Sequence, residues 1–147
     1  TGKILKLDRW VILKALVLLR TLRKKEKRPF RLFVSQAVAA LKDRGRIQWL
    51  ADSMQKSGIT GEGLVLEFRH PEISSEPDLA RDYLQALRDL HIGISLNSQN
   101  ELDTLLNGID DLPADFIKIS ESQIRNYPDT WTRDYQVMGL SEMLYRF

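Results

Sequence analysis

The chain has 147 residues, of which 43% are hydrophobic and 29% charged, and its formal net charge is +2. This size and balance fit one globular domain with a real core, and the small net charge argues against nucleic acid as a general partner. Cysteine is absent, which excludes disulfides, thiolate nucleophiles and cysteine-ligated zinc and fits a reducing cytoplasm, the location we expect.

The first expected element is a helix that Asp8 caps and that runs through the apolar block Trp10 to Leu19 into a basic segment before Pro29. Lys14 interrupts the block, which has about half of the ~20 residues a membrane span needs. We therefore expect an amphipathic helix packed on the core and no membrane insertion. The chain shows no signal-peptide cleavage pattern and begins with threonine, which predicts that it is a piece of a longer sequence.

Four short apolar runs bounded by turn residues predict strands at 31–36, 64–68, 92–97 and 115–120. Helical periodicity follows the first run through Leu41 and, after Gly45, through Met54, and it returns at 101–109 and 131–146. The clearest helix is 74–91, with Ser75 as its expected cap, Pro77 in its first turn, and one apolar face formed by Leu79, Tyr83, Leu87 and Leu90. Strands that alternate with helices predict a parallel sheet, so the expected fold class is α/β.

Each expected strand carries polar side chains near its carboxyl end, on the face opposite its aliphatic residues. Ligands of parallel α/β folds bind beyond the carboxyl ends of the strands, so these side chains predict one shared site. The alternative is that they are ordinary polar residues where strands run into loops. The residues concerned are Ser35, Glu67, Asn97, Lys118 and Ser120.

The segments "TGKILKLDRWVILKAL", "FVSQAVAAL", "GLVLEFRH", "IGISLN" and "LPADFIKIS", in this order and spacing, resemble the EAL family of cyclic di-GMP phosphodiesterases. The resemblance covers roughly residues 1–124 and leaves 125–147 as a divergent aromatic tail of a single domain, 1–147. It implies a TIM-like (β/α) barrel, here incomplete relative to eight strands. It also implies hydrolysis of a cyclic dinucleotide assisted by two Mg²⁺ or Mn²⁺ ions held by carboxylates.

The sequence departs from the family's pattern at the positions that would hold these metals. Ser35 stands where the family has an asparagine ligand, Asn97 and Ser98 stand where it has paired aspartates, and Ser120 replaces the aspartate that follows its lysine. Arg69 and His70 follow the retained glutamate in place of the family's threonine and glutamate, and "QNEL" replaces a glycine-rich loop.

Glu67 and Lys118 are the family positions that this chain retains. One carboxylate cannot hold two hard divalent cations, and neutral serine and asparagine do not supply the missing charge. We therefore expect no catalytic residue, no metal and no cofactor. The expected remnant is a vestigial pocket in which Lys118 pairs with Glu67, formed by Ser35, Glu67, Asn97, Ser98, Lys118 and Ser120.

Two other segments have alternative interpretations. The basic run 20–31 could contact phosphates, although such runs are more often the solvated end of a surface helix. The tail carries aromatic residues of the types found in protein interfaces, or it covers the open side of the core. Its interface candidates are Tyr127, Trp131, Tyr135, Tyr145 and Phe147.

The leading hypothesis is an inactive EAL-like regulatory or scaffolding module of bacterial cyclic di-GMP signalling that acts by protein–protein contact. We expect a protein partner or a homo-oligomer, with cyclic di-GMP bound weakly or not at all, because a half barrel leaves strand edges at 31–36 and 115–120 to be paired. The alternatives are a cyclic di-GMP receptor or phosphodiesterase, and a nucleic-acid binder that uses the basic run.

Overall fold

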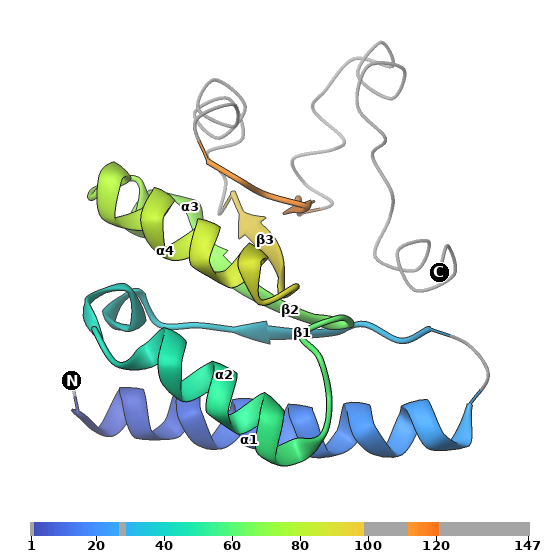
Figure 1. The fold of residues 1–147 in the computed structure, drawn as a ribbon. Helices are drawn as coiled ribbons and strands as arrows, with labels where there is room; N and C mark the ends of the chain where they lie inside the picture. Colours follow the sequence, from blue (N-terminus) through green and yellow to red (C-terminus); the bar gives the residue numbers. More distant parts are fainter. Residues whose placement is uncertain (1, 27–28, 99–111, 121–147) are drawn as a thin grey trace, which may run out of the picture.

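The computed structural model describes residues 2–26, 29–98 and 112–120 (Figure 1). Its centre is a sheet of parallel strands in the order β1-β2-β3-β4, which is also their order in the chain. The strands are β1 Leu32–Ser35, β2 Leu64–Arg69, β3 Gly93–Asn97 and β4 Phe116–Lys118. The predicted α/β class, the parallel sheet and the four strand positions are therefore confirmed.

Helices precede β1, connect β1 to β2 and β2 to β3, and pack on one face of the sheet. They are α1 Gly2–Lys25, the 3₁₀ helix η1 Val38–Lys42, α2 Arg46–Ser57, α3 His70–Ile73 and α4 Pro77–Asp89. Figure 1 shows α1 and α2 lying side by side beneath β1 and β2, with α4 farther along the sheet. This is half of the arrangement of a (β/α) barrel, in which parallel strands form the wall and helices form the outer ring.

The hydrophobic core lies between the helices and the outer face of the strands. Alternation along each strand points aliphatic side chains toward the helices, and α1 contributes residues spaced three and four apart. The main contributors from these two sources are fully or almost fully buried: Ile12, Leu16, Leu19, Val34, Leu64, Leu66, Phe68, Ile94 and Leu96.

The first helix begins earlier than predicted, at Gly2, so Asp8 lies inside it and does not cap it. The Asp8 carboxylate instead accepts a hydrogen bond from the Ala37 backbone N–H at 3.0 Å. The sequence "GKILKL" contains no proline or internal glycine to stop the helix, so the helix extends back past the acidic residue. The side chain that the sequence indicated as a local cap therefore makes a long-range contact.

The predicted cap of the clearest helix is also wrong, although Pro77 does lie in its first turn. Glu76 occupies the capping position without a side-chain hydrogen bond, and the Ser75 hydroxyl donates to the Glu72 carbonyl at 2.8 Å. The buried face of α4 consists of Ala80, Tyr83, Leu84 and Leu87, whereas Leu79 is 36% exposed.

Two predicted helices, 101–109 and 131–146, fall outside the described residues. Within the described ranges, no helix combines the length and continuous apolar character that a membrane-spanning segment requires. The basic run is divided between the last turns of α1 and the approach to β1, with residues 27–28 outside the description.

Candidate functional site

The inner face of the sheet carries the predicted polar residues in two layers. Ser35 pairs in register with Glu67, which pairs with Ser95 on the next strand. One step toward the carboxyl edge, Asn97 stands between Arg69 on β2 and Lys118 on β4. The alternation predicted from the sequence therefore holds, and the strands bring these polar side chains to one edge.

Glu67 is the centre of the inner layer. Its Oε1 accepts a hydrogen bond from the Lys118 ammonium at 3.3 Å and one from the Ser35 hydroxyl at 3.5 Å. The Glu67 side chain is 9% exposed and that of Lys118 is 41% exposed, so the carboxylate is buried and the lysine stem reaches it from the open side. The predicted pair of Lys118 with Glu67 is present, spanning from β2 to β4.

The remaining predicted pocket residues lie at or just beyond the ends of β3 and β4. Asn97 is half-buried, and Ser98, directly after it, is fully buried and donates its backbone N–H to the Lys118 carbonyl at 3.3 Å. Ser120 is exposed beyond the end of β4. The structure thus brings Ser35, Glu67 and Lys118 into contact and holds Ser98 by its backbone.

Arg69 and His70, which follow the retained glutamate, point in different directions. The Arg69 guanidinium lies 3.3 Å from the Glu72 carboxylate at the surface. His70 is 3% exposed and begins the short helix α3.

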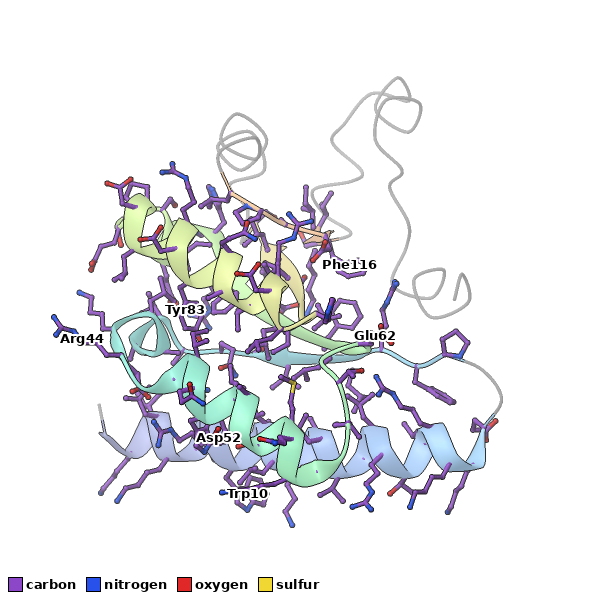
Figure 2. All side chains as sticks on the ribbon, viewed as in Figure 1. Trp10, Arg44, Asp52, Glu62, Tyr83 and Phe116 are labelled. Carbon is purple, nitrogen blue, oxygen red and sulfur yellow. The ribbon has the colours of Figure 1, made fainter. Side chains whose placement is uncertain are left out.

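A second polar cluster, between the helices, was not predicted. Arg46 is completely buried, and its Nη2 donates to Gln36 Oε1 at 2.6 Å while its guanidinium stacks 5.0 Å from the Trp49 ring centroid. Tyr83 lies nearby, and burial raises the pKa of its hydroxyl to about 12, an effect that the charge of Arg46 opposes. Figure 2 shows Tyr83 on the side of α4 that faces η1. The sequence did carry a signal, because Arg46 lies four residues before Leu50 on the apolar stripe of α2.

The opposite edge of the sheet, where the strands begin, contains a pocket of about 580 Å³. Arg31 stacks 5.1 Å from the Phe116 ring centroid there, and burial lowers the pKa of this guanidinium while Asp115 raises it. Val65, Gly93 and Phe116 line the pocket from the inner face of the sheet. Strands that complete a barrel would cover this hollow.

The interface candidates of the aromatic tail lie outside the described residues and stay a prediction. They are Tyr127, Trp131, Tyr135, Tyr145 and Phe147.

The parallel strands with helices outside them identify the chain as part of a (β/α) barrel, with polar residues at the carboxyl ends of its strands. Comparison with known proteins gives its family. Residues 1–139 match the EAL domain. The chain belongs to the EAL domain family. A comparison with curated proteins finds no match.

Solved structures match the same fold. The FimX EAL domain from Pseudomonas aeruginosa bound to c-di-GMP is 27% identical, with a TM-score of 0.72 over 90% of this chain and 52% of that one. The PaMucR phosphodiesterase in complex with c-di-GMP is 20% identical, with a TM-score of 0.73 over 87% of this chain and 55% of that one. The EAL enzyme Bd1971 bound to cAMP and cyclic-di-GMP is 20% identical, with a TM-score of 0.75 over 99% of this chain and 41% of that one. The chain spans about half the length of the first two.

Proposed function

We propose that this chain is a catalytically inactive EAL-like module that regulates or scaffolds bacterial cyclic di-GMP signalling through protein contacts. The observation that carries the proposal is that the Glu67 carboxylate is already paired within the sheet. Glu67 is the only acidic residue in the four described strands, and Lys118 and Ser35 already bind it.

The donor set at the carboxyl edge does not fit a pair of divalent cations. Mg²⁺ and Mn²⁺ favour carboxylate oxygens, and two closely spaced ions require several of them. Here the Glu67 carboxylate accepts hydrogen bonds from an ammonium and a hydroxyl, and a cation would have to displace Lys118. Within the described residues, no group of three or more histidine, cysteine, aspartate or glutamate side chains could hold a metal.

The signalling context is supported by the family and by what its structures contain. FimX and PaMucR are both described with c-di-GMP bound. In this chain Asn97 and Ser98 occupy the end of β3, and Ser98 is buried against the backbone of β4. The two cations of this edge, Lys118 and Arg69, are each paired with a glutamate, so we propose that the edge binds cyclic di-GMP weakly or not at all.

A protein partner is supported by the outer strands. Within the described residues, β1 and β4 are each bonded to one neighbouring strand, and Phe33 is 38% exposed on the inner face. Outer strands with free backbone groups and apolar side chains favour pairing with another chain. A second copy or a different protein would pair with the backbone groups of these outer strands. Light scattering, together with amide exchange in β1 and β4, distinguishes an assembly from a monomer.

The test is a cyclic di-GMP hydrolysis assay on the purified chain with Mg²⁺ or Mn²⁺, read as release of the linear dinucleotide. We expect no product above the protein-free rate. Metal-dependent product that is lost in Glu67→Gln and kept in the matched surface variant Glu76→Gln would establish the phosphodiesterase alternative. Calorimetry showing a tight complex that Lys118→Met abolishes would instead establish a cyclic di-GMP receptor.

A further inference from the structure

The outer surface of α1 is apolar and basic at once. Its exposed apolar residues, 42–60% accessible, are Ile4, Leu7, Trp10, Leu13, Val17 and Leu18. They run from the first turn to Leu18 of a helix of 24 residues, about 36 Å long. Figure 2 shows Trp10 on the side of α1 that faces away from the sheet. These side chains are additional to the buried face of α1, which already fills the core.

Almost all of the charges on the same helix are positive. It carries eight basic residues, Lys3, Lys6, Arg9, Lys14, Arg20, Arg23, Lys24 and Lys25, and a single acidic one, Asp8. Asp8 is turned toward Ala37, whose backbone N–H it binds at 3.0 Å. The ammonium of Lys14 lies 5.5 Å from the Trp10 ring centroid, in the middle of the apolar stretch. Arg9 pairs with the Asp43 carboxylate at 2.7 Å and Arg23 donates to the Glu62 carbonyl. Among the described residues, the other six basic side chains of α1 have no ion-pair partner, so the outer surface of the helix is positively charged.

The position of α1 places this surface on the outside of the described half barrel. Ile12, Leu16 and Leu19 pack against the sheet, so the opposite side of the helix is the outer surface of the helical layer. Strands that close a barrel join at β1 or β4 and cover the inner face. A second copy of α1 is disfavoured here, because two such helices would oppose like charges.

We propose that the outer surface of α1 binds an anionic membrane surface, lying in the interface without crossing it. Leu, Val and Trp side chains suit the boundary between headgroups and acyl chains, and lysine stems can extend from among them to anionic headgroups. The interleaving of basic and apolar residues along a convex helix matches a lipid surface, because a protein groove would require a compact apolar ridge. This inference is independent of the proposed function, and either can fail without the other.

The test uses the full chain and co-sedimentation with vesicles of phosphatidylcholine alone or mixed with phosphatidylglycerol. The apolar variant Leu7→Gln/Val17→Gln is matched by Val38→Gln/Leu79→Gln, which changes the same residue types at exposed positions of η1 and α4. The charge variant Lys6→Glu/Lys14→Glu is matched by Arg44→Glu/Lys56→Glu, at exposed positions outside α1. Circular dichroism checks that all four variants keep the fold.

We expect binding to the anionic vesicles only, weakened at least about tenfold by each α1 variant and by less than about twofold in each matched control. Absence of binding to the anionic vesicles, or equal binding to both kinds, would overturn the proposal. Loss in the matched controls equal to that in the α1 variants would also overturn it. Sensitivity to the charge variant without sensitivity to the apolar variant would also overturn it, because the apolar side chains would then not enter the membrane interface.

Discussion

Phe33 and Phe116 stand edge to face with their ring centroids 5.3 Å apart, although β2 and β3 separate their strands. In a flat sheet, three strand spacings would hold such positions roughly 14 Å apart. The sheet is therefore curved as in a barrel wall. Gly93 leaves the space between them open, since a Cβ there would lie 3.1 Å from Val65 Cγ2 and 3.6 Å from Phe116 Cε2.

This contact predicts an energetic coupling across the sheet. A double-mutant cycle with Phe33→Ala and Phe116→Ala, measured by urea unfolding, should give a coupling of about 0.5–1.5 kcal/mol in the free energy of unfolding. Phe68 faces the helices and contacts Tyr83, so a control cycle of Phe33→Ala with Phe68→Ala should give a coupling near zero. Equal couplings in the two cycles would mean that the inner-face contact is not specific.

Arg46 should be important for stability. Arg46→Met leaves Gln36 Oε1 without its donor and removes the cation beside Trp49, so we expect a loss of about 1–3 kcal/mol in the free energy of unfolding. Arg44, two residues earlier, is exposed, and Arg44→Met should change the same quantity by less than about 0.5 kcal/mol. Similar losses in the free energy of unfolding for the two variants would show that the buried guanidinium does not stabilise the fold.

Tyr83 should make stability fall in alkaline solution. Its pKa is raised by burial from 10.0 to about 12, so the folded state holds the neutral hydroxyl more strongly than the unfolded state does. This contribution is fully present below pH 10 and is lost as the pH rises toward 12, with a size of about 2–3 kcal/mol. Tyr83→Phe should lack this part of the loss. Parallel pH profiles of the two proteins would contradict the buried, unionised tyrosine.

The sheet was predictable from the sequence because its signal is local. Runs such as "LVLEF" and "IGISLN" have a period of two and clear turn residues at their ends, and together they gave the strands, the faces and the pairing of Lys118 with Glu67. The predicted caps Asp8 and Ser75 were wrong, because the Asp8 carboxylate binds a distant backbone N–H and the Ser75 hydroxyl binds the preceding turn. The role of Arg46 was not predicted, because its partner Gln36 and its burial depend on how the elements pack. The exposed apolar residues of α1 were not predictable for a related reason. An apolar run predicts a buried helix, but it does not show which of its residues the sheet covers.

The most direct test of the central claim is a Mn²⁺ titration of the purified chain, followed by electron paramagnetic resonance of the free ion. The Glu67–Lys118 pair in place of a metal centre predicts that all added Mn²⁺ stays free, both in the wild-type chain and in Glu67→Gln. One or two ions bound per chain, lost in Glu67→Gln and kept in Glu76→Gln, would contradict the account and restore the carboxyl edge as a catalytic metal site.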